Sequence, residues 1–197
     1  LLDEIKSFQS RVNGVICVDT SPIMEKDWAQ KAGLGWRGKH TNLITRDYGS
    51  WVFLGELLLD IELKYDAPFE DDLCGTCTAC LDACPTDAFP EPYVLDSSKC
   101  ISYLTIEHRG DLPVEMENKL SGWVYGCDIC QQVCPWNIKF SQNSQEAPFQ
   151  PRTNLKDRTL IEWNQLTEEE FRTLFKGSAV KRTKYVGLKR NIDLGRK

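Results

Sequence analysis

The cysteines restrict the fold of this chain more than any other feature. Four of them lie within eleven residues, in the run Cys74-Gly-Thr-Cys77-Thr-Ala-Cys80-Leu-Asp-Ala-Cys84-Pro85. Cysteines this close together converge on one inorganic centre more readily than they form disulfides with distant partners, and the total of nine is odd. The spacing is the C-x2-C-x2-C-x3-C-P run of bacterial four-iron sites, so the sequence predicts metal ligation in a reducing compartment.

A second set of cysteines repeats the end of this run. It is Cys127-Asp-Ile-Cys130-Gln-Gln-Val-Cys134-Pro135, and Cys100 supplies a further ligand from upstream. In two-cluster proteins the last cysteine of a run ligates the other cluster. We therefore expect two [4Fe-4S] clusters with crossed ligands. The first cluster is assigned to Cys74, Cys77, Cys80 and Cys134, and the second to Cys84, Cys100, Cys127 and Cys130.

Zinc is the alternative metal for these cysteine ligands, but zinc sites favour two separated cysteine pairs over a run of four. The ninth cysteine, Cys17, lies in an apolar segment and is expected to be a small buried hydrophobic residue. Two adjacent clusters pass single electrons. The chain is therefore either an electron carrier or a protein whose clusters supply electrons to another redox centre in the same chain. The 73 residues before Cys74 favour the second function.

The composition predicts a globular chain. Its 197 residues are 41% hydrophobic, enough for one substantial core or two small ones. The longest apolar run, residues 51–61, is interrupted by Glu56 and Asp60, and no basic segment followed by an apolar one opens the chain. We therefore expect neither export nor membrane insertion, and a cytoplasmic location.

The net charge of −5 conceals an asymmetry. Residues 176–197 carry eight basic side chains and one acidic one, which is a charge of +7 and leaves −12 on residues 1–175. Since Lys and Arg make phosphate contacts, this segment can bind a polyanion that the rest of the chain repels. The alternative is a solvated basic helix face.

Hydrophobic patterning before the cysteines predicts alternating strands and helices. Residues 12–18 predict a buried strand that brings Asp19 to its end. Ser21 and Pro22 suit the start of a helix that Gly33 ends, and a glycine-spaced loop follows. Residues 51–60 predict a strand or a short helix.

The residues after the cysteines predict a linker and then helices. Residues 141–153 are polar and contain two prolines. Thr167 and Glu170 form a capping box for a helix that ends near Gly177, and residues 180–194 predict a second, basic helix.

Five longer motifs resemble the epoxyqueuosine reductase family. They are Val18-Asp-Thr-Ser-Pro-Ile-Met-Glu25, Ala32-Gly-Leu-Gly-Trp-Arg-Gly-Lys-His40, Gly49-Ser-Trp-Val-Phe-Leu-Gly-Glu-Leu57, Cys100-Ile-Ser-Tyr-Leu-Thr-Ile-Glu107 and Tyr125-Gly-Cys-Asp-Ile-Cys-Gln131. They are far more specific than the cysteine run, which many enzymes share. The family has a further N-terminal stretch and a longer helical C-terminus, so the chain is expected to be a fragment.

The resemblance implies a cobalamin cofactor, reduced through the clusters, that converts epoxyqueuosine to queuosine at the wobble position of transfer RNA. Asp19 matches the family's proton donor, and burial against the corrin would keep it protonated. Without the resemblance Asp19 would be interpreted as a helix cap. Cobalamin contacts are implied for Asp19, Lys39, His40, Asn42, Ser102, Tyr103 and Gly126, with loop scaffold as the alternative role.

The same resemblance implies an RNA-facing role for part of the basic segment. The residues concerned are Lys181, Arg182, Lys184, Lys189 and Arg190. We also expect a monomer that takes electrons from an external one-electron donor of the flavodoxin or ferredoxin type.

The expected fold is α+β. Residues 1–69 are assigned to part of a cobalamin-binding α/β domain, 70–140 to a ferredoxin-like two-cluster module, 141–158 to a linker and 159–197 to the start of a HEAT-like helical repeat domain. Two other functions remain open: a cobalamin-dependent reductase of small molecules, similar to reductive dehalogenases, and a plain two-cluster electron carrier. The basic segment argues against the first, and corrinoid absorption bands would exclude the second.

Overall fold

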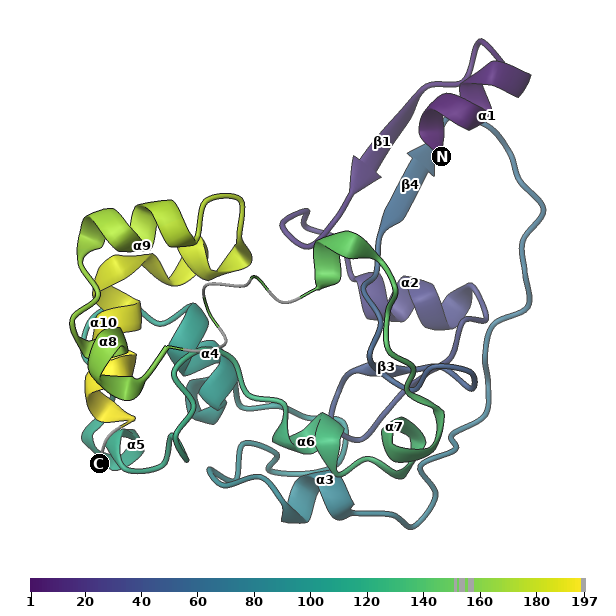
Figure 1. Ribbon diagram of the computed structural model, residues 1–197. Coiled ribbons are helices and arrows are strands. Elements are labelled where there is room, and N and C mark those ends of the chain that lie inside the picture. The colour runs from purple at the N-terminus through teal and green to yellow at the C-terminus, as the bar shows by residue number, and fades with distance from the viewer. Residues whose placement is uncertain (151, 153–154, 156–157, 196–197) are drawn as a thin grey trace.

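The computed structural model describes residues 1–150, 152, 155 and 158–195. Within them, the chain forms short helices, loops and two antiparallel strand pairs (Figure 1). The α-helices are α1 (Leu2–Phe8), α2 (Glu25–Lys31), α3 (Ala79–Asp82), α4 (Ile101–Ile106), α5 (Val114–Glu117), α6 (Ile129–Gln132), α7 (Pro135–Phe140), α8 (Leu160–Asn164), α9 (Glu168–Leu174) and α10 (Lys184–Leu194). The strands are β1 (Gly14–Cys17), β2 (Trp36–Arg37), β3 (Leu43–Ile44) and β4 (Glu56–Leu59), and 3-10 helices cover Ser97–Lys99, Ala147–Phe149 and Ala179–Thr183.

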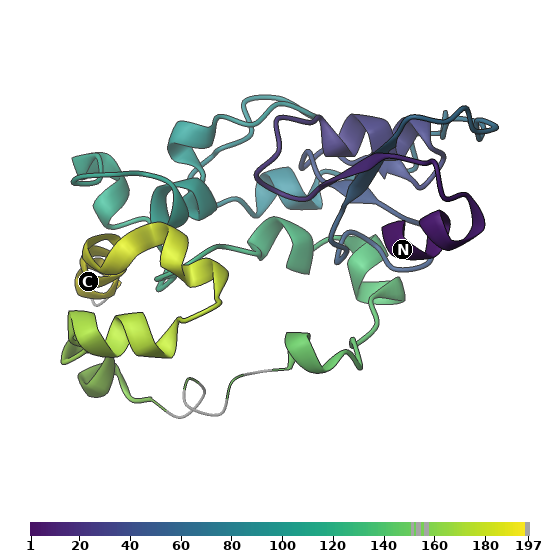
Figure 2. The ribbon, with the colours of Figure 1, turned by 90° about the horizontal axis from the view of Figure 1, so that it is seen from above.

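The cysteine-rich part lies between the two ends of the molecule. Seen from above, α1 with the β1–β4 pair occupies one end and α8, α9 and α10 the other (Figure 2). None of the helices in the described residues is both long and apolar enough to cross a membrane. The mixture of helices and strands agrees with the α+β prediction.

Strand β1 carries the chain to Asp19. It pairs antiparallel with β4, with Gly14 opposite Leu59 and Cys17 opposite Glu56. The strand predicted before Asp19 is therefore present, and of the two alternatives for residues 51–60 the strand is found, over Glu56–Leu59. Cys17 is buried as expected, but the prediction of a buried strand is wrong, since Val15 is 60% exposed. The strand pair projects from the rest of the molecule, with α1 beside it (Figure 1). Asp19 therefore follows an exposed strand.

Helix α2 begins later than predicted. Met24 is its N-cap and makes no side-chain cap, so the prediction that Ser21 caps the helix is wrong. The carboxylate of Glu25 instead accepts a hydrogen bond from the backbone N–H of Asp19 at 2.9 Å. Asp19 has φ of 51°, which turns the chain back toward α2 and leaves residues 19–24 as a loop.

A buried amide joins the first part of the chain to the cysteine module. Asn137 in α7 accepts a hydrogen bond from the N–H of Ser50 at 2.6 Å and donates to the hydroxyl oxygen of Ser50 at 2.8 Å. Gly49 has a φ of 66°, and a Cβ there would lie 2.1 Å from Oδ1 of Asn137. Only glycine permits this close approach. A small core of Trp36, Ile44 and Cys134 packs next to it.

The C-terminal helices start at two capping boxes. The predicted box of Thr167 and Glu170 at α9 is confirmed, and Thr159 with Glu162 forms a second one at α8, which the sequence analysis missed. The predicted single helix over 180–194 is instead a 3-10 helix followed by α10, because Lys184 adopts a φ of 62° between them. Their shared core contains Leu166, Phe171, Phe175, Leu188 and Ile192.

Two predicted segments are only partly described. The linker at 141–158 contains the 3-10 helix Ala147–Phe149, while residues 151, 153, 154, 156 and 157 lie outside the described residues. Arg196 and Lys197 of the basic segment lie outside them as well.

Helix α10 docks on the carbonyl end of α4 through Asn191. This fully buried amide donates to the carbonyl oxygens of Thr105 at 2.8 Å and Val124 at 2.9 Å. Replacing Asn191 with alanine should lower the free energy of unfolding by about 1–3 kcal/mol, because a buried carbonyl loses its donor. Denaturant unfolding of anaerobic protein measures the loss, with exposed Val186→Ala on the same helix as control. Equal stability of the two variants would contradict this role.

Candidate iron-sulfur and active site

The first predicted cysteine set surrounds a cavity. Its volume is about 180 Å³, and its sulfur-bearing lining is Cys74, Cys77, Cys80 and Cys134. Cys74 and Cys77 lie in the loop before α3, while Cys134 is the N-cap of α7. The packing of α3 against α6 brings the two distant runs together. The four residues are those assigned to one cluster from the crossed spacing.

Two of the thiols that line this cavity, Cys80 and Cys134, are held in their neutral form. Burial raises the pKa of Cys80 to about 11, and the neighbouring Cys74 and Cys134 raise it further. Burial also raises the pKa of Cys134. Since iron binds the thiolate, metal loading must displace these protons and compensate the buried negative charge. The donor set and the cavity fit an iron-sulfur cluster.

The second predicted set lies beside the first. Burial raises the pKa of Cys130 to about 12, with Cys127 and Cys100 as the next causes and Cys84 also contributing. Cys80 of the first set acts on Cys130 too, so the two sets are neighbours. In the described part of the chain, no three histidine, cysteine or acidic side chains form a group that could hold a single metal ion. The cysteines of the second set, Cys84, Cys100, Cys127 and Cys130, lie within electrostatic reach of one another, beside the cavity of the first set.

Asp19 lies on the surface and contacts the C-terminal part of the chain. Its side chain is 78% exposed, so the burial expected for it is not provided by the described residues. The carboxylate forms an ion pair with Arg182 at 3.4 Å, and Nε of Arg182 lies 2.5 Å from Glu107. The ion pair joins residues 163 positions apart in the sequence. The expected proton donor and a predicted RNA contact thus meet at one point.

Lys39 and His40, both implied as cobalamin contacts, lie at the first cysteine set. Nζ of Lys39 donates to the carbonyl oxygens of Gly75 at 2.6 Å and Cys77 at 2.9 Å. His40 is 2% exposed and lines the cavity of the first set. Burial lowers the pKa of His40 to about 4. These two side chains are therefore in contact with the cluster site.

The other implied cobalamin residues are spread around the second set. Oδ1 of Asn42 accepts from Nζ of Lys26 at 3.1 Å. Tyr103, three residues after Cys100, is 40% exposed, and Ser102 before it is half-buried. The N–H of Gly126 donates to the hydroxyl of Thr105 at 3.0 Å.

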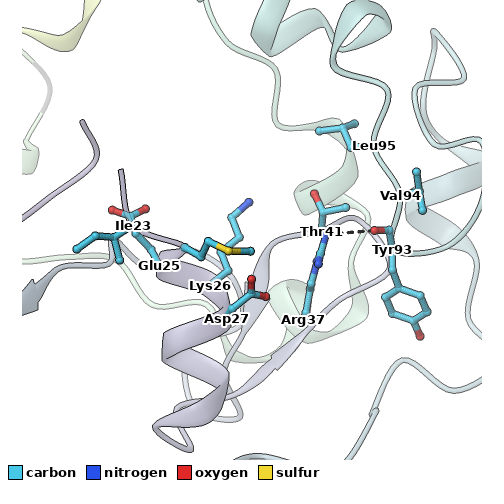
Figure 3. Close-up of a pocket in the computed structure, with 10 residues that line it drawn as sticks. Ile23, Glu25, Lys26, Asp27, Arg37, Thr41, Tyr93, Val94 and Leu95 are labelled. Carbon is cyan, nitrogen blue, oxygen red and sulfur yellow. Dashed lines mark hydrogen bonds between the residues drawn. The ribbon is translucent and has the colours of Figure 1, made fainter. Parts of the chain in front are cut away.

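An open cavity of about 530 Å³ lies between the start of α2 and residues 93–95 (Figure 3). Lys26 and Arg37 reach into it, and Nη2 of Arg37 donates to the carbonyl oxygen of Tyr93 at 3.2 Å. Burial lowers the pKa of Lys26, and the charge of Arg37 lowers it further, whereas Cys130 raises it. One side chain that lines the cavity, Lys26, is thus within electrostatic reach of Cys130 of the second set. Lys26 and Tyr93 were not predicted from the sequence, because no short motif marks residues that meet only in the folded chain.

The five predicted RNA contacts differ in their surroundings. Lys181 and Lys184 are exposed. Lys189 donates to the carbonyl oxygen of Asn164 and pairs with Asp193. Arg190 is partly buried and donates to the carbonyl oxygens of Leu104 at 2.8 Å and Gly110 at 2.5 Å. Lys189 and Arg190 therefore hold the helices together in this structure.

Comparison with known proteins agrees with this geometry. Residues 73–137 match the family model of the 4Fe-4S double cluster binding domain. The epoxyqueuosine reductase of Cellulophaga algicola is 53% identical over 182 residues, which are 92% of this chain and 59% of that protein. The chain belongs to the epoxyqueuosine reductase family. The resemblance predicted from the motifs is confirmed, and the chain spans about 59% of the length of that relative.

Solved structures of the family superpose closely. An epoxyqueuosine reductase with a tRNA-Tyr epoxyqueuosine-modified stem loop matches with a TM-score of 0.89 at 33% identity, over 98% of this chain and 52% of that one. The Bacillus subtilis family member, with its catalytic aspartate loop swung out of the active site, also has a TM-score of 0.89, at 31% identity, over 98% of this chain and 50% of that one.

Proposed function

We propose that this chain is the cluster-bearing part of an enzyme that reduces epoxyqueuosine to queuosine in transfer RNA. The observation that carries the proposal is the order of the sites: two adjacent cysteine groups, then an open cavity bordered by α2. The loop that carries Asp19 leads directly into α2. This order suits electrons that enter through the clusters and are used beside a proton donor.

The proposed cofactors are two [4Fe-4S] clusters and cobalamin. The open cavity fits a redox cofactor because Lys26, which lines it, lies within electrostatic reach of Cys130 of the second set. Of the implied contacts, Asn42 accepts a hydrogen bond from Lys26, which lines the cavity, and Tyr103 is exposed three residues after Cys100. When bound, cobalamin supplies strongly reducing cobalt for opening the epoxide.

Asp19 is the proposed proton donor to the departing epoxide oxygen. Without a proton this oxygen would leave as an alkoxide, which a positioned carboxylic acid avoids. The exposed position of Asp19 suits a loop that meets a substrate arriving from solvent. The Bacillus subtilis relative, whose catalytic aspartate loop is mobile enough to swing out, supports this assignment.

Transfer RNA is the proposed substrate, and the basic segment is its proposed docking surface. A relative has been solved with an epoxyqueuosine-modified stem loop. Arg182 belongs to the basic segment and pairs with Asp19, so RNA bound to exposed Lys181 and Lys184 would lie near the proton donor. Lys189 and Arg190 are proposed to support this surface from within.

Removing the two exposed lysines should weaken RNA binding in a salt-dependent way. For Lys181→Ala combined with Lys184→Ala, we expect the slope of log K against log salt to fall in magnitude by about two, since each phosphate contact contributes about one. Fluorescence anisotropy with a transfer-RNA stem loop measures it. The matched control is Lys6→Ala with Lys64→Ala, two exposed lysines far along the chain from this segment. A slope equal to that of the control would remove these lysines from the RNA interface.

The remaining parts of the proposal follow from the same sites. Residues 1–69 are proposed to form part of the cobalamin-binding domain, 70–140 the two-cluster module, 141–158 a linker and 159–197 the start of a HEAT-like domain. We propose a monomer in the reducing cytoplasm, supplied by a flavodoxin- or ferredoxin-type donor.

The direct test is an anaerobic assay of the full-length protein with epoxyqueuosine-containing transfer RNA, cobalamin and a low-potential donor. Mass spectrometry of digested nucleosides should show queuosine. Iron-sulfur absorption without bound corrinoid and without queuosine would favour a plain electron carrier. Corrinoid binding with no turnover of RNA would favour a reductase of small molecules.

A further inference from the structure

The segment Trp36–His40 wraps the first cysteine set. Nε1 of Trp36 donates to Sγ of Cys74 at 3.5 Å, and Trp36 is 1% exposed. Lys39 holds the same loop through the carbonyl oxygens of Gly75 and Cys77. His40 completes the lining of the cavity. A segment outside the cysteine module therefore forms one wall of the first cluster site.

The hydrogen bonds of His40 determine which ring nitrogen carries the proton. Nδ1 of His40 accepts from the backbone N–H of Asn42 at 3.2 Å, so its lone pair is occupied and Nδ1 carries no hydrogen. The hydrogen of the neutral ring is then on Nε2. Nε2 is buried and, among the described residues, has no hydrogen-bond partner. A buried N–H without an acceptor costs about 1–3 kcal/mol, so an acceptor is expected in the cavity it borders.

We propose that Nε2–H of His40, together with Nε1–H of Trp36, donates hydrogen bonds to sulfur atoms of the first cluster and raises its reduction potential. In the described part of the chain no carbonyl or carboxylate accepts a hydrogen bond from Nε2, whereas four cysteine sulfurs line the same cavity. Hydrogen bonds to cluster sulfurs stabilise the electron added on reduction. In that step one electron arrives from an external one-electron donor, no bond forms or breaks, and His40 keeps its proton.

This role gives acceptors to the ring N–H groups of two buried side chains, Trp36 and His40. If His40 only filled space, an apolar residue could take its place. If Trp36 served only for packing, its N–H would need no sulfur acceptor. The inference depends on the double-cluster site and not on the RNA reaction. If the hydrogen-bond proposal were refuted, the proposed epoxyqueuosine chemistry would be unaffected. If the enzyme formed no queuosine, the hydrogen-bond proposal would be unaffected.

The test is a potentiometric titration of the full-length, anaerobically loaded protein, followed by electron paramagnetic resonance. In His40→Leu the equilibrium constant for reducing the first cluster should fall about tenfold, which corresponds to about 59 mV for one electron. Trp36→Phe, which keeps an aromatic ring but loses the N–H, should shift it in the same direction. His40→Gln, which retains an N–H donor, should recover part of the loss. The second cluster is the internal control and should keep its potential.

A second readout does not depend on potentials. Pulsed electron paramagnetic resonance of protein with 15N-labelled histidine should show coupling of the reduced first cluster to His40, and His40→Leu should lose it. An unchanged first-cluster potential in iron-replete His40→Leu would overturn the proposal. The His40→Leu variant can also fail to assemble that cluster. In that case the proposal is overturned by absence of the 15N coupling in the parent protein, or by an unchanged first-cluster potential in Trp36→Phe.

Discussion

Asp19→Asn should lower queuosine formation by roughly 10²–10⁴-fold while leaving the clusters and the corrinoid bound. Asparagine has nearly the same shape as aspartic acid but cannot deliver a proton to the departing oxygen. The fold should tolerate the change, because the side chain is exposed and the bond to Glu25 uses the backbone N–H of residue 19. Single-turnover assays with reduced full-length enzyme measure the rate.

The control for this variant is Asp47→Asn, another exposed aspartate in a loop. It should keep the parental rate, and both variants should show unchanged iron content and corrinoid absorption. The ion pair with Arg182 is lost in Asp19→Asn, so RNA affinity is measured alongside to separate chemistry from binding. Turnover of Asp19→Asn at the parental rate would exclude Asp19 as the proton donor.

Cys134→Ser should remove one whole cluster, and the identity of that cluster tests the crossed ligation. Eight irons per molecule, the content of a 4Fe-4S double cluster domain, should fall to four. The cluster that is lost should be the one that Cys74→Ser also removes, because Cys134 lines the same cavity as Cys74. Queuosine formation should stop, since the electron path is interrupted. Iron analysis and electron paramagnetic resonance of anaerobic protein measure both effects.

Two further variants make this result decisive. Cys130→Ser should remove the other cluster, since Cys130 lies among Cys127, Cys100 and Cys84. Cys17→Ala should keep the full iron content, because this buried cysteine lies in β1 beside β4. If Cys134→Ser and Cys130→Ser lost the same cluster, the crossed assignment would be wrong.

Local sequence patterns predicted the parts of this structure that depend on neighbouring residues. The capping box of Thr167 and Glu170 involves atoms three residues apart, so its prediction needed no tertiary information. The strand before Asp19 was predicted from its β-branched residues, but its exposure was not. Burial depends on what packs against a strand, and hydrophobic patterning does not report that.

The candidate site shows the same division. Cysteine spacing was enough to propose two groups of four, whereas the implied corrin contacts Lys39 and His40 lie against the first group. Their position follows from the pairing of β2 with β3 and from the packing of Trp36, which bring residues 36–40 to the loop after Cys74. No spacing within residues 36–40 contains that information.

By itself, the sequence determined which side chains are available for metal and proton chemistry, because ligand type and close spacing are properties of the chain. Only the tertiary structure decided their partners: Asp19 with Arg182, and His40 with the first cysteine group. The physical reason is that hydrogen bonds and burial act over a few ångströms in space. Residues 163 positions apart come within that range only when the chain has folded.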